Sequence, residues 1–448
     1  MPSDQLSRQL AAAFSDRQLF LVGGSLRDQL LGRPIKDLDL ATDARPEEIQ
    51  HRVGRWADSV WSVGEKFGTV GLLKDGIKAE ITTFRADTYD GASRKPEVTF
   101  GDDIVADLER RDFTINALAR NLHTGELLDP LGGQQDLTER LVRFVGAAEQ
   151  RIAEDPLRLM RAVRFCAQLG FELEPATAVA IAKAPHELAR ISRERIRDEL
   201  DGMLLSDHPV EGLRLLIDLG LTERVLPELL RLHLPQPARH HLKDVLDHSL
   251  DTVAFVPPEK ALRYAALLHD IAKPDTFSTD ETGIHFYRHE ELGAQRAREI
   301  LTRVRQPAAL IEQVAVLIGH HLRIPFYSPE WSLSAVRRLM FDLGDELDNA
   351  IALAKADVQA SDPSDFPEFE QRLVELRSRI AEVGEAATLA AMKPLLNGNE
   401  IMSLLHLPPG PRVGEALQFL LDQQIEGNIT TREEAEEAVR REFGTARG

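Results

Sequence analysis

The sequence predicts an α/β head followed by three helical segments. Strand signals are confined to about the first 145 residues, where LFLV (19–22), DLDLA (37–41) and VGLLKDGIKAEITTF (70–84) show short apolar runs or alternation. From about residue 147 onward, helical spacing and helix-end signals replace them. At 448 residues the chain is also too long for one ordinary core. The predicted domains are a head (1–145), a neck (146–235), a third domain (236–360) and a tail (361–448).

Composition excludes several classes of protein. Hydrophobic residues make up 43% and charged residues 28%, which is ordinary for a globular protein and excludes a disordered or collagen-like chain. No stretch approaches the roughly 18 continuous apolar residues of a membrane helix, and the N-terminus lacks the pattern of a secretory signal. The single cysteine, Cys166, excludes an internal disulfide. We therefore expect a cytoplasmic protein without membrane contact.

Charge is distributed unevenly along the chain. The 54 Lys and Arg against 73 Asp and Glu give a net charge of −19, which by itself argues against a nucleic-acid binder. Between residues 158 and 197, however, eight basic residues face four glutamates, whereas residues 361–448 hold nine basic and sixteen acidic residues. A basic middle still permits a polyanionic ligand.

The first chemical signal is Gly23-Gly24-Ser25, which joins the strand LFLV to the helical segment SLRDQLLG. Backbone N–H groups at such a junction can bind a phosphate. A plain turn is the alternative for this short motif alone.

Carboxylates follow on the predicted strands. Asp37 and Asp39 are two residues apart in DLDL, so both point to one face while Leu38 and Leu40 point to the core. Hard oxygen ligands in this arrangement suit Mg²⁺. Glu80, on a later strand, is a third candidate, with an ordinary surface glutamate as the alternative.

These motifs, in this order, resemble the DNA polymerase β nucleotidyltransferase superfamily. RRDFTINALA (110–119), DPLGGQQDL (129–137) and EDPLRLMRAVRF (154–165) are similar to motifs of its class II tRNA nucleotidyltransferases, the CCA-adding enzymes. The resemblance runs from about residue 19 to residue 200. It implies a mixed sheet with helices in the head, and it implies tRNA, CTP and ATP as substrates.

The resemblance also implies roles for individual residues. Asp37 and Asp39, with Glu80 as a third carboxylate, would hold the metal ions that activate the tRNA 3′-hydroxyl and stabilise the leaving pyrophosphate. The residues implied in nucleotide binding are Gly23, Gly24, Ser25 and Arg27 at the triphosphate, Arg111, Asp112 and Asn116 at the sugar, Asp155 and Arg158 at the base, and Arg161 and Arg164 further along the same helix.

Asp155 and Arg158 are expected to share one helical face, because they are three residues apart. Aspartate offers only acceptors and arginine only donors. Cytosine and adenine both present an amine beside a ring acceptor, whereas uracil and guanine present a carbonyl beside an N–H. One such pair can therefore accept C and A and reject U and G without a template. A surface salt bridge is the alternative. RISRERIRDEL (190–200) resembles the last family motif, with Arg195 as its leading functional candidate.

Residues 86–107 are expected to form a loop of twenty-two residues without regular structure. In the family resembled, a flexible loop here helps the pocket change from C to A addition. Its presence disfavours a CC-only enzyme but does not separate CCA addition from A addition.

Histidines gather in the third domain, where nine of the fourteen lie between His233 and His321. The order His248, His269-Asp270 and Asp357 resembles the HD phosphohydrolase superfamily. Imidazole and carboxylate ligands would bind a transition metal such as Mn, Ni, Co or Fe, and His289 and His320 are candidates for a second metal position. The resemblance implies a phosphatase or 2′,3′-cyclic phosphodiesterase activity, with a purely structural domain as the alternative.

The acidic tail resembles the C-terminal tRNA-binding segment of the same family. Three further readings stay open: an enzyme that adds only the final A, a poly(A) polymerase, which the EDPLR motif disfavours, and an HD phosphohydrolase whose head only binds tRNA. The sequence leaves the oligomeric state undetermined.

Overall fold

The computed structural model describes residues 2–35, 37–63, 68–88, 97–236, 243–384 and 392–444. The chain divides into two compact units, Met1–Val225 and Leu226–Gly448. No helix in the described part of the chain is both long enough and apolar enough to span a bilayer.

The first unit begins with a seven-stranded mixed sheet of order β3-β4-β5-β2-β1-β8-β9. β2 and β5 are parallel, and the other neighbouring pairs are antiparallel. The Asp75-Gly76 turn predicted between β4 and β5 is present, and both residues have the positive φ that a tight hairpin needs. The strands are β1 (Leu19–Val22), β2 (Asp37–Thr42), β3 (Ser59–Val63), β4 (Thr69–Lys74), β5 (Ile77–Thr83), β8 (Ala119–Asn121) and β9 (Leu127–Leu128).

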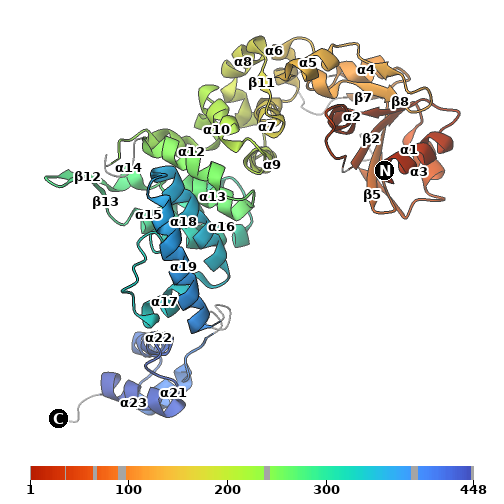
Figure 1. Cartoon of the computed structure of the whole chain (residues 1–448). Helices are drawn as coiled ribbons and strands as arrows, with labels where there is room; N and C mark the ends of the chain where they lie inside the picture. The colour runs from red at the N-terminus through yellow and green to blue at the C-terminus, as the bar shows by residue number, and fades with distance from the viewer. Residues whose placement is uncertain are drawn as a thin grey trace. The chain divides into compact units, whose positions relative to one another are not determined.

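Helices lie against this sheet (Figure 1). α1 and α3 pack on β5, and α2 packs on β1 and β2. Leu38 and Leu40 of β2 are each 1% exposed, so the predicted alternation along this strand is confirmed. The helices of the head are α1 (Pro2–Ala13), α2 (Gly23–Leu30), α3 (Pro46–Val53), α4 (Ile104–Glu109) and α5 (Gly133–Glu139), with a 3₁₀ turn at Thr114–Asn116.

The prediction of a loop over residues 86–107 is wrong at both ends of this segment. β6 (Arg85–Thr88) and β7 (Glu97–Phe100) form an antiparallel pair, and α4 begins at Ile104, where the Asp103 side chain accepts a hydrogen bond from the N–H of Val105. Strand pairing depends on backbone hydrogen bonds, so a segment rich in Gly, Ser and Pro can contain paired strands that its composition does not indicate. Residues 89–96 lie outside the described residues.

The neck is helical, apart from a short parallel pair, β10 (Leu141–Val142) and β11 (Glu172–Leu173). α7 packs against α9 and α10 through one apolar face and ends at Gly170, which adopts the left-handed conformation of a helix C-cap. Its helices are α6 (Ala148–Glu154), α7 (Arg158–Leu169), α8 (Pro175–Ala182), α9 (Arg193–Leu204), α10 (Pro209–Asp218) and α11 (Thr222–Val225), with a 3₁₀ helix at Pro185–Arg190.

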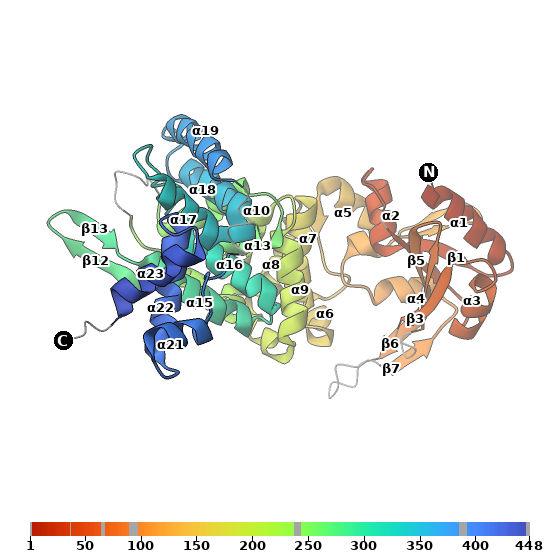
Figure 2. The same cartoon turned by 90° about the horizontal axis from the view of Figure 1, so that it is seen from below.

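The second unit is a helical body with one hairpin, formed by β12 (Phe277–Asp280) and β13 (Gly283–Phe286), which extends away from the helices in both views (Figures 1 and 2). The helices of the body are α12 (Val245–Phe255), α13 (Lys260–Leu268), α14 (Lys273–Thr276), α15 (His289–Arg303), α16 (Ala308–His320), α17 (Leu333–Leu343), α18 (Leu347–Ser361) and α19 (Phe366–Val383), with 3₁₀ turns at Pro227–Leu232 and Gly344–Glu346.

The predicted break near residue 361 is present, because α18 ends at Ser361 and α19 begins at Phe366. α19 nevertheless packs against α17 and α18, so it is part of the helical body. The last three helices share a small core of their own around Ile401, Leu420 and Val439. They are α21 (Gly398–Leu405), α22 (Pro411–Ile425) and α23 (Arg432–Phe443).

Candidate active sites

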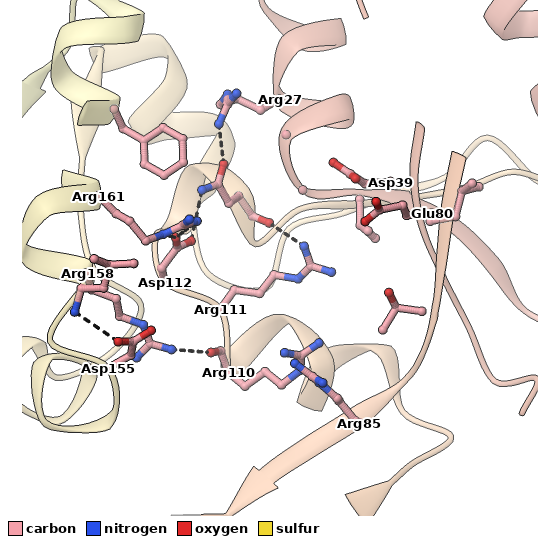
Figure 3. Close-up of a pocket in the computed structure, with 18 of the residues that line it drawn as sticks. Arg27, Asp39, Glu80, Arg85, Arg110, Arg111, Asp112, Asp155, Arg158 and Arg161 are labelled. Carbon is pink, nitrogen blue, oxygen red and sulfur yellow. Dashed lines mark hydrogen bonds and ion pairs between the residues drawn. The ribbon is translucent and has the colours of Figure 1, made fainter. Parts of the chain in front are cut away.

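Three predicted carboxylates share one face of the head sheet. Asp37 and Asp39 alternate with buried leucines on β2, and the Cα of Asp39 pairs with the Cα of Glu80 on the parallel strand β5. Residues directly opposite on neighbouring strands point to the same side, and Figure 3 shows Asp39 and Glu80 next to each other. Lys78 forms an ion pair with Glu80 at 2.6 Å. The ladder between β2 and β5 therefore aligns the three carboxylates.

The Gly-Gly-Ser motif joins β1 to α2 and holds β2 in place. The hydroxyl of Ser25 donates to the carbonyl of Asp37 at 2.9 Å and accepts the N–H of Asp39 at 2.7 Å. Its proton is thus committed to the carboxylate strand and is not free for a phosphate. Gly23 has φ +62°, and a Cβ there would lie 3.1 Å from an Arg111 nitrogen. Only glycine fits this junction.

A cavity of about 560 Å³ lies beside these carboxylates (Figure 3). Seven arginines line it against four carboxylates, a formal balance of +3 that suits a triphosphate. Its charged lining residues are Arg27, Arg85, Arg110, Arg111, Arg158, Arg161 and Arg195, with Asp39, Glu80, Asp112 and Asp155.

A continuous polar chain crosses the cavity wall. Arg27 donates to Asn116 at 2.8 Å, and Asn116 donates in turn to Asp112 at 3.1 Å. The other oxygen of Asp112 accepts two hydrogen bonds from Arg161. Burial by itself would raise the pKa of Asp112, but the charge of Arg161 and these hydrogen bonds lower it to about 2. The three motifs that carry these residues are therefore joined in one structure.

Asp155 and Arg158 do not share a helical face. Asp155 is an extended residue that ends α6, and α7 begins only at Arg158. Asp155 pairs with Arg195 at 2.6 Å, whereas Arg158 pairs with Glu154 at 2.6 Å and donates to the carbonyl of Arg110. The alternative of a mutual salt bridge is wrong for the same reason. Both side chains nevertheless line the cavity.

The sequence analysis missed Arg85 and Arg110 of the cavity lining, and it also missed two residues of the EDPLRLMRAVRF motif. The ring of Phe165 lines the cavity under the guanidinium groups of Arg27 and Arg161, at 5.1 and 5.3 Å from its centroid. Glu154 is buried and orients Arg158. The sequence did contain a signal, since both lie inside the EDPLRLMRAVRF motif. Arg164, by contrast, is not among the residues that line the cavity, and it bonds Glu199 and Gln168 instead.

A second cavity of about 460 Å³ shares Gly24, Arg27 and Asp39 with the first. Asp37 lines only this second cavity, together with Arg33. Its two arginines face four aspartates, so its formal balance is −2. The carboxylate pair thus borders two spaces of opposite charge.

In the second unit, two triads of ligand atoms face each other. In each triad the ligand atoms lie within 4.8 Å of one another, and among the described residues only these two groups meet that distance. Asp270 has one oxygen 3.2 Å from His269 and the other 3.3 Å from His289, so it lies between the triads. The triads are His248, His269 and Asp357, and Asp270, His289 and His321.

His321 occupies the place predicted for His320. Its Nε2 atom lies 3.3 Å from that of His289 and its side chain is buried. Neighbouring residues in helical backbone point about 100° apart, so only one of the two histidines can face the cluster. Sequence spacing alone did not show which one.

The backbone orients the imidazoles of the cluster. In His269, His289 and His321, Nδ1 lies 2.7–2.9 Å from the carbonyl oxygen three residues earlier. A carbonyl only accepts, so Nδ1 carries the proton and Nε2 is left as the ligand atom. Burial lowers the pKa of His321 to about 3, which keeps this imidazole neutral.

Asp270 carries the charge at the centre of the cluster. Burial would raise its pKa, but His269 and Lys273 hold the pKa well below its usual value. Lys273 Nζ lies 2.7 Å from Asp270 and also donates to Gln236. The cluster combines imidazole nitrogens with carboxylate oxygens, the donor set of a transition-metal site.

Comparisons with known proteins identify three domain families along the chain. Residues 19–143 match the family described as "Poly A polymerase head domain", residues 170–232 match "Probable RNA and SrmB- binding site of polymerase A", and residues 206–358 match "HD domain". The predicted resemblance is confirmed by these matches and by full-length relatives.

The chain is 38% identical over 439 residues to the A-adding tRNA nucleotidyltransferase of Deinococcus radiodurans, covering 94% of both chains. It is 34% identical over 439 residues to the CC-adding tRNA nucleotidyltransferase of Thermus thermophilus, covering 94% of this chain and 93% of that one. Among solved structures, the CCA-adding enzyme of Bacillus stearothermophilus in complex with CTP superposes with a TM-score of 0.70 at 27% identity, over 98% of this chain and 96% of that one.

Proposed function

This chain belongs to the tRNA nucleotidyltransferase family, and we propose that it adds C, C and A to the 3′ end of tRNA from CTP and ATP. The observation that carries the proposal is the pair of acidic strands, β2 and β5, beside an arginine-lined cavity that also holds Asp155 and Arg158. Such a site needs a polyanionic substrate and a cation between its carboxylates.

The head carboxylates fit Mg²⁺. All three donors are hard oxygens, and burial raises the pKa of Asp39, a cost that a nearby cation offsets. Asp37, Asp39 and Glu80 would hold the metal, which when bound supplies activation of the 3′-hydroxyl and stabilisation of the leaving pyrophosphate.

We assign the nucleoside triphosphate to its cavity by charge, and the tRNA 3′ end to the other cavity because both Asp37 and Asp39 line it. The nucleoside triphosphate occupies the cavity of balance +3, with its phosphates near the backbone N–H groups of Gly23 and Gly24 and near Arg27. The tRNA 3′ end enters the cavity of balance −2, which brings its hydroxyl to Asp37 and Asp39. The shared wall at Asp39 is where the two reactants meet.

Base choice falls to Asp155 and Arg158. Each of these side chains forms an ion pair with a charged partner. Asp155 pairs with Arg195 and Arg158 pairs with Glu154, so both are oriented before the base binds. An acceptor beside a donor selects the edges of C and A. Arg111, Asp112 and Asn116 would contact the sugar.

The nucleotide range is tested by three tRNA substrates, one without CCA, one ending in C and one ending in CC, each with labelled CTP or ATP. We expect two C residues and one A to be added in order. Addition of A alone to the CC form would instead make this an A-adding enzyme. Addition of C alone would make it a CC-adding enzyme.

We propose a second activity, hydrolysis of phosphoesters, for the histidine cluster. The two triads share a centre at Asp270, whose two oxygens face different histidines, so the residues present fit two adjacent divalent metal ions of the Mn, Ni, Co or Fe type. A metal there would supply a nucleophilic water at neutral pH. Metal analysis of the purified protein, followed by assays with 2′,3′-cyclic nucleotides, tests this directly. Absence of both bound metal and hydrolysis would make the cluster structural.

Two smaller assignments remain part of the proposal. We place the protein in the cytoplasm, where tRNA and nucleotides are available and where a lone buried thiol, Cys166, stays reduced. We retain four functional parts, head (1–145), neck (146–235), HD-type domain (236–360) and tRNA-binding tail (361–448), although α19 at the start of that tail packs on the helical body and residues 226–235 belong to the second unit. Limited proteolysis with fragment identification would test these borders.

A further inference from the structure

A cavity of about 350 Å³ opens over the histidine cluster and is lined by two kinds of side chain. One group holds the ligands His248, Asp270, His289, His321 and Asp357, with the cations Lys273 and Arg372. The other group, called the apolar wall here, consists of Leu322, Pro325, Phe326 and Val358. A charged reacting group and an apolar body would each find a matching surface.

Phe326 is the unusual member of the apolar wall. It is 72% exposed, although it lines a cavity and directly precedes the buried Tyr327. Single exposed hydrophobic side chains are common on protein surfaces, but an exposed aromatic ring that lines a cavity offers a stacking surface to a ligand in that cavity. Within this unit, Phe326 is also the only large exposed hydrophobic residue, among those described, that lines this cavity.

The backbone on both sides of Phe326 is fixed. The guanidinium group of Arg372, on α19, donates to the carbonyl of Pro325 at 3.3 Å and to that of Tyr327 at 3.2 Å. Arg379, about two helical turns further on, donates to the carbonyls of Pro329 and Trp331. Tyr327 itself is buried against Trp331. These hydrogen bonds hold the backbone of Phe326 next to the cavity.

We propose that Phe326 is a stacking platform for the base of a nucleotide whose phosphoester lies at the histidine cluster. The proposal rests on the second activity proposed above and adds the residue that selects a nucleoside over other phosphoesters. Phe326 is thus a specificity-determining residue and takes no part in the bond-breaking step.

The shape and polarity of the cavity favour one nucleotide unit. Its volume is near the lower end of small-molecule sites, roughly 300–1,000 Å³, so it can bury a mononucleotide but not several bases. Ser361 and Asp365 also line it and offer a hydroxyl and a carboxylate to ribose hydroxyls. Lys273 lies on the metal side, where a phosphate belongs.

The first experiment compares two substrates that differ only in the base. Wild type and Phe326→Leu, both full-length and loaded with Mn²⁺ or Ni²⁺, are assayed with adenosine 2′,3′-cyclic phosphate and with ribose 2,3-cyclic phosphate. Stacking one base on one ring is worth roughly 5- to 100-fold. We expect kcat/KM for the nucleotide to fall about tenfold or more, while kcat/KM for the ribose compound stays within about twofold.

Phe255 provides a matched control. It is 47% exposed on α12 and does not line the cavity, so Phe255→Leu should leave kcat/KM unchanged for both substrates. Phe326→Trp keeps an aromatic face and should retain the preference for the nucleotide. If Phe326→Leu lowers kcat/KM equally for both substrates, or for neither, the proposal that Phe326 stacks on the base is wrong.

A binding measurement separates this proposal from the second activity itself. Isothermal titration calorimetry with adenosine 3′-phosphorothioate, a poorly hydrolysed probe, measures the affinity of wild type and of Phe326→Leu. The double variant His269→Ala, Asp270→Ala lacks the phosphoester site, so it reports any binding of the probe to the head. Weaker binding in Phe326→Leu supports the platform even if no phosphoester is hydrolysed. Equal affinity in wild type and Phe326→Leu refutes the platform even if hydrolysis occurs.

Discussion

The carboxylate face of the head and the histidine cluster of the second unit are both candidate metal sites, but they are built on different backbones. In the head, three oxygen donors are aligned by the ladder between two parallel strands, and Asp37 is exposed. In the cluster, four histidines and two aspartates converge from helices and helix ends, and all but Asp357 are buried.

The difference follows from what each site must admit. An open strand face leaves room for a triphosphate and an RNA end, so its cation can be shared with the substrate. Three of the four imidazoles in the cluster are oriented by carbonyls three residues away, so most of the site is formed before any ligand enters. Since no ligand is common to both sites, each can be disabled alone.

The largest effect should come from the strand carboxylates. We expect Asp39→Ala to lower nucleotide incorporation about 10³-fold or more, because loss of a metal ligand removes several kcal/mol of transition-state stabilisation. Asp37→Ala should behave similarly. Metal content and hydrolysis at the histidine cluster should stay normal in both variants. Single-turnover incorporation of labelled CTP measures the loss, and near-normal rates would remove these residues from catalysis.

A variant of the histidine cluster tests whether nucleotide addition in the head is independent of that cluster. His269→Ala with Asp270→Ala removes ligands from both triads, so the transition metal and the phosphoester hydrolysis should be lost by about 10²-fold or more. Nucleotide addition should remain within about twofold. Metal analysis and both assays on one preparation decide the matter, with thermal unfolding as the check that the second unit is folded. A comparable fall in nucleotide addition would mean that the two sites are coupled.

Base selection is the next largest effect. Asp155→Asn keeps the size of the side chain but adds a donor, so discrimination of C and A against U and G should fall about 10²-fold. Glu154→Gln weakens the support of Arg158, together with the ion pair between Glu154 and Arg151, and should lower this discrimination less, about tenfold. Competition between labelled nucleotides measures the ratio. Slower addition with unchanged selectivity would assign base choice to other residues.

A charge swap is the wrong way to test this pair. Exchanging the two side chains would place a carboxylate at 158 beside Glu154 and a guanidinium at 155 beside Arg195. Two like charges would then meet at each position.

A smaller effect concerns stability and pH. The folded pKa of Asp112 is about 2, below its value in an unfolded chain, so its ionised form stabilises the first unit above about pH 4. That contribution, on the order of 2 kcal/mol, is lost as the pH falls from about 4 to about 2. Asp112→Asn should therefore lower the Tm of the first unit at pH 7, and the difference from wild type should vanish near pH 2. A difference that is independent of pH would assign the effect to packing.

The smallest effect is expected at Arg164. Arg164 bonds Glu199 and Gln168 away from the cavity, so Arg164→Lys should change the KM for CTP by less than about threefold. Arg161→Lys breaks the double hydrogen bond to Asp112, so it should raise the KM for CTP more than Arg164→Lys does. Steady-state kinetics of the two variants provide the comparison. An equal rise in both would mean that Arg164 also reaches the nucleotide.

What the sequence determined by itself is local. The alternation of Asp37 and Asp39 with buried leucines follows from the two-residue period of a strand, and the Asp-Gly turn follows from the φ angles that those residues tolerate. The mixed sheet, the helical domains and the two families were likewise predictable, because their motifs are contiguous segments in a fixed order.

Only the tertiary structure decided which distant side chains meet. The register of β2 on β5 sets Glu80 opposite Asp39, and the break between α6 and α7 separates Asp155 from Arg158 and gives each a different partner. The turn at the end of α16 directs His321, and not His320, into the cluster. Strand register and side-chain direction depend on packing between elements far apart in the chain, and a one-residue change in either reverses the result.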